Sequence, residues 1–365
     1  MFYRAIGLMS GSSLDGLDIA FVEFQEQGGK WTYEIKAADC LPYEDGWAER
    51  LKNAIHLPAL DYQLLHTDYG HYLGKKVNEF IDGNGLHYQA GLVSSHGHTT
   101  FHLPLQGMTG QIGDGAAIAA ETALPVVSDL RAMDVAFGGQ GAPIVPIGEK
   151  LLMPEYDYFL NIGGIANISV NREEYIAFDV CPANRVLNML ANDAGKPYDA
   201  GGEMAAGGKL NDDLLDKLNA LDYYAKPWPK SLANDFGTDV VYPLIKAAGC
   251  TEADALHTFS EHIAIQISMS VGALSNQQPV TGNQQLLITG GGALNTHLVN
   301  RIAAHVAAHN IEVVVPEAAL VNYKEAIIMA FIGVLRWRQE KNVLASVTGA
   351  RRDSVGGALW MGAEG

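Results

Sequence analysis

Apolar and polar positions alternate along the chain in two patterns. Short apolar runs that end in glycine turns are typical of buried strands, and they occur at residues 91–97, 158–164 and 285–292, with a further short run at 312–317. Longer stretches with apolar residues three and four apart predict helices over residues 64–81, 115–123, 261–274 and 324–339. Because predicted strands and helices alternate through most of the chain, we expect an α/β fold.

The first glycine turn lies between two apolar runs, in "AIGLMSGSSLDGLDIAFVEF" at residues 5–24. The second run is rich in β-branched and aromatic residues, so it predicts a strand rather than a helix. The turn has no Walker-type lysine and no Gly-x-Gly-x-x-Gly spacing. Its backbone N–H groups could still bind an anion, and Asp15 or Asp18 could hold magnesium beside phosphates. Taken alone, the segment is equally an ordinary hairpin.

Two later glycine loops have related forms. "FLNIGGIANIS" at residues 159–169 is a second strand, glycine pair and strand, bracketed by Asn161 and Asn167. This repetition suggests two duplicated domains that clamp a polyphosphate from opposite sides. "LLITGGGALN" at residues 286–295 runs from a strand into three glycines and then a helix-like segment from residue 293, which would let a ligand approach a helix N-terminus closely.

Length and charge restrict the function classes. The 365 residues, 48% of them hydrophobic, are enough for about two domains. A polar stretch at 129–141 suggests a boundary there, with residues 1–130 joined by 341–365 in one domain and 131–340 in the other. The net charge of −17 argues against nucleic-acid partners and anionic membrane surfaces. It leaves room for a small phosphorylated ligand bound by a local loop.

Cysteine usage and the N-terminus predict a compartment. Cys40, Cys181 and Cys250 are widely spaced and form no Cys-x-x-Cys pair, which argues against a disulfide framework. The first residues lack the order of a signal peptide, and no apolar run reaches the roughly 18 residues of a membrane span. We therefore expect a soluble, cytoplasmic protein without a membrane partner.

The ordered glycine loops resemble those of the sugar kinase/actin/Hsp70 superfamily. Within it, the chain is similar to the anhydro-N-acetylmuramic acid kinases from Gly7 to Ala350, through "GLMSGSSLDGLD", "SSHGHTTFH", "GGQGAPIVP", "NIGGIANIS", "FDVCPAN", "PKS", "ITGGGALN", "EAIIMAF" and "SVTGA". The resemblance implies a two-domain actin-like (ribonuclease H-like) α/β fold whose interdomain cleft closes on its ligands. It implies ATP and Mg²⁺ as cofactors, with nucleotide contacts from Gly11, Ser12, Ser13, Leu14, Asp15, Gly16, Leu17, Asp18, Gly163, Gly164, Asn167, Gly290, Gly291 and Gly292, and Asp15 as a metal ligand.

The same resemblance implies the reaction. Enzymes of this family hydrolyse the 1,6-anhydro bridge of an anhydro amino sugar and phosphorylate O6 with ATP, giving N-acetylmuramate 6-phosphate in peptidoglycan recycling. Such a reaction needs a base for water, a clamp for the γ-phosphate and magnesium. Members are often homodimers, so a homodimer is expected here.

Asp179 matches the family's catalytic aspartate, at the end of a short apolar strand. The alternative from the residues alone is that Asp179 caps the helix that follows. The family usually has Thr-Gly after this aspartate, whereas this chain has Val180 and Cys181. These bulkier residues could narrow the pocket, and we interpret Cys181 as a packing residue rather than a nucleophile.

His96 matches the family's sugar loop. Its neighbours His98 and His102 raise the alternative of a zinc site, but the spacing fits no standard finger and no cysteine pair completes it. His98 stands where many members have glutamine. A polar turn satisfied by backbone groups is the other alternative for this loop.

Arg131 and Glu325 are the remaining substrate candidates. An arginine fork suits the lactyl carboxylate of the muramyl sugar; the alternative is a surface ion pair with Asp129 or Asp134. Glu325 is expected at a helix start, where the helix dipole alone favours it, or on a sugar hydroxyl. Asp114 is a helix cap or a pocket residue.

Two other functions remain open at this point. A kinase for another anhydrosugar, such as levoglucosan, would keep the ATP loops and Asp179 but would not use Arg131 for a carboxylate. A nucleotide-binding regulator or chaperone-like ATPase would keep the glycine loops and would not depend on Asp179.

Overall fold

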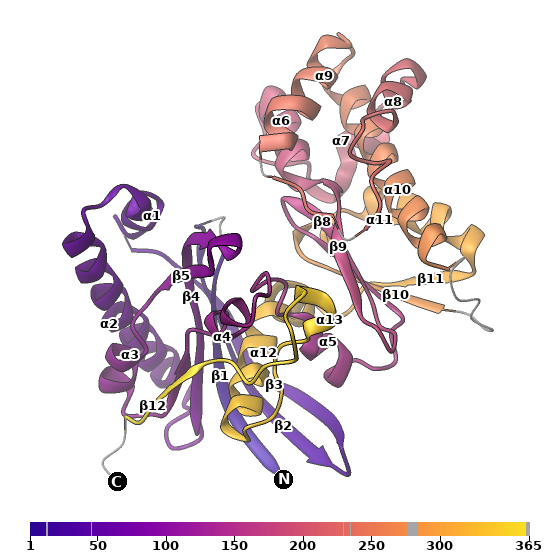
Figure 1. The fold of residues 1–365 in the computed structure, drawn as a ribbon. Coiled ribbons are helices and arrows are strands. Elements are labelled where there is room, and N and C mark those ends of the chain that lie inside the picture. Colours follow the sequence, from indigo (N-terminus) through magenta and orange to yellow (C-terminus); the bar gives the residue numbers. More distant parts are fainter. Residues whose placement is uncertain (12–13, 45, 229, 234, 276–283, 363–365) are drawn as a thin grey trace. The chain divides into compact units, whose positions relative to one another are not determined.

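The computed structural model describes residues 1–11, 14–44, 46–228, 230–233, 235–275 and 284–362. The chain divides into two compact units, Met1–Pro154 with Tyr323–Gly365, and Glu155–Asn322. Each unit has one β-sheet and its own hydrophobic core (Figure 1). These bounds differ from the boundaries at 130 and 340 that the polar stretch suggested, because residues 131–154 are tied into the first unit by the buried contacts of Arg131, Asp134 and Glu149 described below.

The first unit is built on a sheet with the order β12-β6-β4-β1-β2-β3, with β5 paired to β4. Strands β1–β2 and β2–β3 are antiparallel, while β1–β4 and β4–β6 are parallel. The β1–β2 pair confirms that the first glycine turn joins two strands. The strands are β1 (Phe2–Ser10), β2 (Gly16–Gln27), β3 (Lys30–Pro42), β4 (Leu92–Leu103), β5 (Met108–Ile112), β6 (Val126–Ser128) and β12 (Ala358–Trp360).

The second unit repeats this arrangement in the order β11-β10-β7-β8-β9. Strands β7–β8 and β8–β9 are antiparallel, while β7–β10 and β10–β11 are parallel. The shared order and strand directions confirm the predicted duplication, the α/β class and the two-domain actin-like fold. The strands are β7 (Tyr158–Ile162), β8 (Ile165–Val170), β9 (Ile176–Pro182), β10 (Gln284–Thr289) and β11 (Ile311–Val314).

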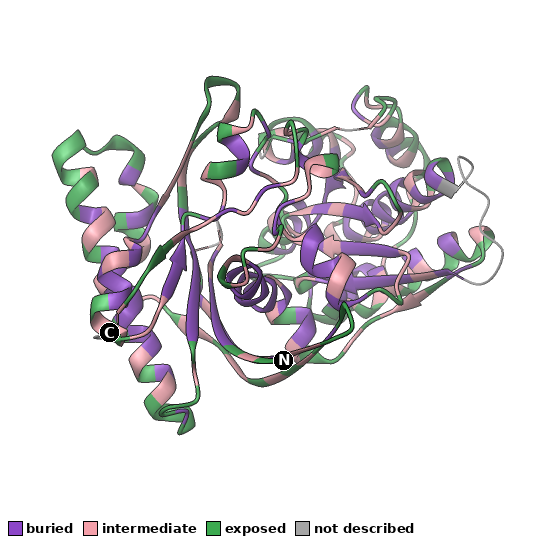
Figure 2. Cartoon of the chain, turned by 60° about the horizontal axis from the view of Figure 1, so that its bottom comes forward, coloured by how far each residue is buried: buried purple, intermediate pink, exposed green. Residues whose placement is uncertain are grey.

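Two long helices dominate the first unit's packing. In α2, apolar residues at intervals of three and four face the core, and Figure 2 shows this helix buried along one side and exposed along the other. Helix α12 is long and apolar enough to cross a membrane, but 72% of its apolar window is buried inside the protein, as in a core helix. It lies directly on β1, where a side chain on Gly7 would come within 1.9 Å of the Ala326 carbonyl oxygen. The helices are α1 (Trp47–Lys52), α2 (Ala59–Asn84), α3 (Gly115–Thr122), α4 (Ala132–Ala136), α5 (Pro146–Leu152), α12 (Ala318–Trp337) and α13 (Ala345–Thr348).

The second unit's helices surround a core centred on α10. The predicted helix over 261–274 is the C-terminal part of this longer helix. The helix after the three glycines begins later than residue 293, because Gly291–Leu294 form a 3₁₀ turn and Asn295 caps α11 by accepting the Leu298 N–H at 3.0 Å. The helices are α6 (Asn184–Asp193), α7 (Glu203–Gly207), α8 (Asp212–Asn219), α9 (Tyr242–Ala247), α10 (Glu252–Ser275) and α11 (Thr296–Val306). The chain also forms 3₁₀ turns η1 (Ala54–His56), η2 (Pro104–Gln106), η3 (Ala200–Gly202), η5 (Gly291–Leu294) and η6 (Ala307–His309), and a short π-helix, η4 (Phe236–Val241).

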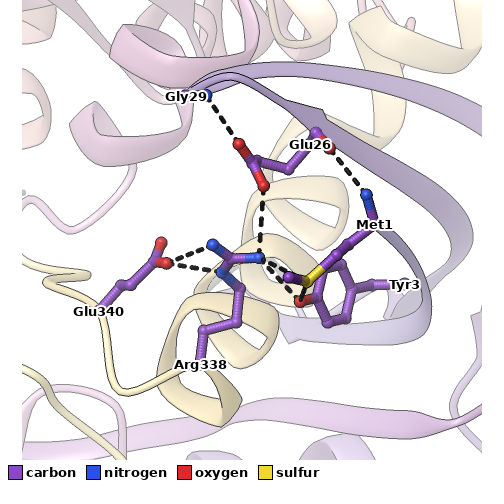
Figure 3. A network of polar contacts seen from close by, with 6 residues as sticks. All are labelled: Met1, Tyr3, Glu26, Gly29, Arg338 and Glu340. Atoms are coloured by element: carbon purple, nitrogen blue, oxygen red, sulfur yellow. Dashed lines mark hydrogen bonds and ion pairs between the residues drawn. The ribbon is translucent and has the colours of Figure 1, made fainter.

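A polar network holds the end of α12 against the first hairpin (Figure 3). Arg338 donates to the Tyr3 hydroxyl at 2.7 Å and pairs with Glu340 and Glu26. Glu26 in turn accepts the Gly29 N–H at 2.7 Å. The guanidinium also lies over the Tyr3 ring, 5.4 Å from its centroid. These contacts fix the helix that carries Glu325.

Candidate active site

A row of polar residues crosses four strands of the second unit's sheet. Thr289 on β10 pairs with Asn161 on β7, Asn161 pairs with Asn167 on β8, and Asn167 pairs with Asp179 on β9. Residues directly opposite one another on neighbouring strands project from the same face of a sheet. The fold therefore brings the predicted base beside the asparagines that bracket the second glycine turn.

Asp179 lies at an irregularity of β9. Ala166 pairs with Cys181 while Asn167 pairs with Asp179, so Val180 is an extra residue in β9, as in a β-bulge. Helix α6 begins after Ala183 without a side-chain cap, which excludes the alternative that Asp179 caps it. Instead, one carboxylate oxygen, Oδ2, accepts the Leu232 N–H at 2.9 Å.

Burial has the largest effect on the pKa of the Asp179 carboxyl. It raises the pKa of this carboxyl, while the Leu232 N–H lowers it by stabilising the charged form. The neighbouring Val180 and Cys181 are both fully buried in the core. Burial also raises the pKa of the Cys181 thiol, so the thiol is protonated at neutral pH, which supports the interpretation of Cys181 as a packing residue.

The second and third glycine loops meet in the structure. The carbonyls of Gly163 and Gly164 accept the first N–H groups of α6, from Asn184 and Ala183. A side chain on Gly292 would come within 2.2 Å of Ile162, at the end of β7. Gly290 has a φ of 78°, which favours glycine, and a side chain there would meet Asn161. The two loops thus lie side by side, and the absence of side chains permits their approach.

A pocket of about 290 Å³ opens beside these loops. Its volume is at the lower end of the range for small-molecule sites. It is lined by Asn184, Leu187, Asn188, Tyr198, Asp199, Gly201, Gly291, Leu294 and Asn295. Of these, Gly291 is the residue predicted from the sequence to contact the nucleotide, while Asn184, Leu294 and Asn295 lie in the quoted motifs without a predicted role. The glycine-rich stretch at residues 201–208 is the sequence feature that could have indicated that the segment from Tyr198 to Gly201 lines a pocket.

The first glycine turn lies in the other unit, and it is described in part. Ser12 and Ser13 lie outside the described residues. The Gly11 carbonyl accepts the Leu14 N–H at 3.4 Å. The side chain of Leu17 belongs to the hydrophobic core, so only its backbone could face a phosphate. Gly16 lies close against Leu41 and Cys40 of β3, where a side chain would clash.

Asp18 is a partly buried carboxyl of this turn. Burial raises its pKa to about 6, and repulsion from Asp15 and Glu325 adds to the rise, while a hydrogen bond from Cys40 opposes it. The three carboxyls are therefore close enough to interact. Glu325 lies in the third turn of α12, which begins at Ala318, so the expectation that it stands at a helix start is wrong. The N-terminal dipole consequently does not account for this residue.

Arg131 connects two of the predicted segments. It donates from Nε to Nε2 of His96 at 2.8 Å and from Nη1 to the Gly141 carbonyl at 2.6 Å. The expected alternative, an ion pair with Asp129 or Asp134, is not what holds the guanidinium. Burial lowers the pKa of Arg131 to about 10, so it stays charged at neutral pH.

Asp134 anchors the loop that receives Arg131. Its carboxylate accepts the Gly141 N–H at 2.8 Å and the Thr348 hydroxyl at 2.7 Å, and the residue is fully buried. The family-like segments "SSHGH", "GGQGAP" and "SVTGA" therefore meet around Arg131, although they are far apart in sequence. Asp114, by contrast, caps α3 by accepting the Ala116 N–H at 2.9 Å.

The three histidines of the sugar loop have separate partners. His98 Nδ1 lies 3.0 Å from the Ser10 hydroxyl, which in turn contacts the Tyr43 hydroxyl at 2.6 Å. His102 Nδ1 contacts Thr109 at 3.0 Å. Since His96 is held by Arg131, the rings do not converge. Among the described residues, no three histidine, cysteine or acidic side chains are arranged to bind a metal by themselves.

Comparison with known proteins identifies the family. The family model for anhydro-N-acetylmuramic acid kinase matches residues 3–362. An anhydro-N-acetylmuramic acid kinase of Paramagnetospirillum magneticum is 32% identical over 97% of this chain and 98% of its own length. One of Hydrogenovibrio crunogenus is 33% identical over 97% of both chains, and one of Gloeobacter violaceus is 33% identical over 95% of this chain and 96% of its own. The chain belongs to the anhydro-N-acetylmuramic acid kinase family.

Proposed function

We propose that this kinase hydrolyses the 1,6-anhydro bond of 1,6-anhydro-N-acetylmuramic acid and phosphorylates O6 with ATP. The products are N-acetylmuramate 6-phosphate and ADP, and the setting is peptidoglycan recycling in the cytoplasm. The observation that carries the proposal is the polar row that ends in Asp179, a carboxylate with one oxygen fixed and its pKa raised.

Asp179 acts as the base in this proposal. A water molecule attacks C1 while Asp179 takes its proton, and the bond from C1 to O6 breaks. Burial raises the pKa of the Asp179 carboxyl above its ordinary value, which makes the ionised carboxylate a stronger base. O6 then attacks the γ-phosphorus, the bond to the β-phosphate oxygen breaks, and ADP leaves. Because O6 is phosphorylated as it is released, it needs no separate proton donor.

ATP is the phosphoryl donor. The pocket beside Gly291 has room for part of the nucleoside, and the neighbouring glycine loops leave backbone free of side chains. The first turn, from Gly11 to Asp18, would face the phosphates through backbone N–H groups. The assignment of the first turn rests on its resemblance to the family's loop, and that of the second and third loops rests also on their adjacency within the second unit.

Magnesium fits the carboxyls of the first turn. Asp15 and Glu325 raise the pKa of Asp18, so a cation there would relieve the repulsion among them. Magnesium is usually bound by one or two carboxylates together with waters and phosphate oxygens, so an all-protein cage is not required. Asp15 and Asp18 would hold it, and when bound it would neutralise charge on the phosphates.

Arg131 would recognise the lactyl carboxylate. Its Nε and one Nη1 proton are occupied by His96 and Gly141, which leaves Nη2 to bind a carboxylate oxygen. Levoglucosan has no carboxylate for such a contact. The geometry around Arg131 therefore favours the muramyl sugar over the other anhydrosugar.

The test is ADP release from Mg-ATP with 1,6-anhydro-N-acetylmuramic acid, with levoglucosan and without sugar. We expect turnover with the muramyl sugar, and a loss of about 10⁴-fold in Asp179→Asn, comparable to removal of other essential bases. Glu174→Gln is the matched control, because Glu174 is exposed on the segment that leads into β9.

Each alternative has its own outcome. Faster turnover of levoglucosan would reassign the substrate. ADP release without sugar that persists in Asp179→Asn would leave only a nucleotide-binding ATPase. A homodimer also remains a prediction, and sedimentation of the wild-type protein tests it.

A further inference from the structure

Asp179 lies on β9, which is the edge strand of the second sheet among the described residues. Strand β9 is last in the order β11-β10-β7-β8-β9. Its free edge is covered instead by residues 230–232, because the Asp179 N–H donates to the Lys230 carbonyl at 3.2 Å and the Leu232 N–H donates to Oδ2 at 2.9 Å. One short segment thus holds both the backbone and the side chain of Asp179.

A second contact holds Asp179 from another segment. The Tyr223 hydroxyl donates to the Asp179 carbonyl at 2.7 Å. The Lys230 ammonium joins the two segments, since it lies 3.4 Å from the Tyr223 carbonyl oxygen and 3.5 Å from that of Tyr224. It also lies over the Tyr223 ring, 4.6 Å from the centroid, where a cation–π attraction adds to these contacts.

Lys230 does not bind the Asp179 carboxylate itself. In the described structure that carboxylate has the Leu232 N–H as its hydrogen-bond donor, on Oδ2, and Oδ1 has no partner. The ammonium instead faces main-chain carbonyls, which fixes the position of its own backbone. Lys230 therefore acts on Asp179 through the main chain of residues 230–232 and through Tyr223, not through an ion pair with the carboxylate.

We propose that Lys230 is a positioning residue for the base. It holds residues 230–232 on the edge of β9, so that the Leu232 N–H occupies Oδ2 and Oδ1 is left to take the proton from the attacking water. This inference rests on the proposed function of Asp179. It gives a role to the "PKS" segment, which the sequence resemblance left without one.

The pH dependence of turnover should report this role. The titratable side chains that lie around Asp179 are Tyr223 and Cys181, and burial raises the pKa of both. Both are therefore neutral between pH 5 and 8. Burial lowers the pKa of Lys230 itself, but the group faces carbonyls rather than the carboxylate. The acid limb of kcat/KM should consequently follow the ionisation of Asp179.

The experiment compares Lys230→Met and Lys230→Arg with the wild type across pH 4.5 to 8.5. In Lys230→Met we expect kcat/KM for the anhydro sugar to fall about 10- to 100-fold, as for a displaced catalytic group. The acid limb should move up by roughly one pH unit, because the ionised carboxylate loses the Leu232 N–H. The KM for ATP should not change, and Lys230→Arg should keep most of the activity.

Lys226→Met is the matched control. Its ammonium lies near the same Tyr223 ring, 5.8 Å from the centroid, but contacts neither tyrosine carbonyl. It should retain the wild-type rate and acid limb. Thermal unfolding shows whether Lys230→Met folds. If it does not, Lys230→Gln replaces it, because the glutamine side chain is neutral and too short to reach the carbonyls of both Tyr223 and Tyr224.

The outcomes separate this inference from the proposed function. Wild-type protein without turnover of the anhydro sugar overturns the proposed function. Wild-type turnover with an unmoved acid limb in Lys230→Met overturns the role of Lys230 and leaves Asp179 as the base. An equal loss at every pH, accompanied by a raised KM for ATP, would make Lys230 a general structural residue and also overturn the inference.

Discussion

Arg131 and His96 form a hydrogen-bonded pair in which the direction of the bond is known. Arginine can only donate, so His96 Nε2 accepts at 2.8 Å and the ring proton is on Nδ1, which donates to the Gly97 carbonyl at 2.9 Å. Burial and the guanidinium lower the pKa of His96 to about 3. The imidazole is thus neutral, in one tautomer, with both nitrogens occupied. A direct contact of His96 with the sugar stays a prediction, whereas its orientation of Arg131 is visible.

If His96 no longer orients Arg131, binding of the lactyl carboxylate of the sugar should weaken. In His96→Ala we expect the KM for 1,6-anhydro-N-acetylmuramic acid to rise about tenfold, equivalent to about 1.4 kcal/mol, with a smaller change in kcat. The KM for 1,6-anhydro-N-acetylglucosamine, which lacks the lactyl group, should stay the same. His96→Gln keeps an acceptor and serves as the control. An equal rise for both sugars would instead indicate that His96 contacts a part that they share.

Two buried histidines should make the protein less stable in acid. Burial lowers the pKa of His96 and of His262 to about 3, whereas the unfolded chain binds the proton near its ordinary value of about 6.5. Between these values the unfolded state takes up protons that the folded state does not. The free energy of unfolding should therefore fall by about 1.4 kcal/mol per pH unit for each histidine as pH drops below about 6.5.

Urea unfolding at pH 7.5, 5.5 and 4.5 measures this slope. His262 contacts Asn219 and Tyr224, so His262→Gln retains a polar side chain there while removing the titration. The slope should become shallower in this variant and stay unchanged in His87→Gln, at an exposed site. A slope that is the same in all three proteins would assign the acid sensitivity to other groups.

Asp18 should limit stability at neutral pH. Its folded pKa of about 6 lies above the ordinary aspartate value of 3.8, so the folded state loses stability as pH rises between these two values, and the loss is complete above about pH 6. Asp18→Asn should stabilise the protein at pH 7.5, and this gain should disappear below about pH 4, where the carboxyl is protonated in both states. Turnover with Mg-ATP should fall on the order of 100-fold, as for loss of one electrostatic group.

Thermal unfolding at pH 7.5 and below about pH 4, together with ADP release, tests whether Asp18 lowers the stability of the protein while supporting its activity. Asp222→Asn, at an exposed site, is the comparison. A variant that keeps full turnover would remove Asp18 from the phosphate site. A variant that is destabilised at pH 7.5 would show that the carboxylate makes a favourable contact that outweighs its burial.

Glu149 and Lys324 form a buried ion pair next to Glu325. Their side chains are 3% and 4% exposed and the charged atoms lie 2.7 Å apart. Glu149→Gln or Lys324→Met alone should cost about 3–5 kcal/mol, because each removes the opposite charge that lies 2.7 Å from a buried charge. Glu149→Leu combined with Lys324→Met should restore most of that loss. Urea unfolding measures the stability of the three variants. A double variant as unstable as the less stable of the two single variants would contradict the expected effect of the ion pair.

Local sequence was sufficient for the strands that lead into the three glycine loops, but β3, β5, β6 and β12 were not predicted. The apolar runs before Gly11, Gly163 and Gly290 end where the structure ends β1, β7 and β10. Asp114 was recognisable as a cap because capping depends on residues two or three positions away. The motifs also identified the family, since they are ordered features of the chain itself.

The sequence alone determined the α/β class, the duplicated glycine hairpins, the family and the candidate base. Only the tertiary structure decided that Asn161, Asn167 and Asp179 form one row, that Arg131 binds His96 instead of an aspartate, and that Lys230 and Leu232 hold the edge of β9. It also showed that α12 begins at Ala318, seven residues before Glu325, and not at Glu325. Turns, caps and periodicity depend on neighbours in sequence. Register, burial and the pKa of a buried group depend instead on residues that are distant in sequence, such as Arg131 and His96, 35 positions apart, or Leu232 and Asp179, 53 positions apart.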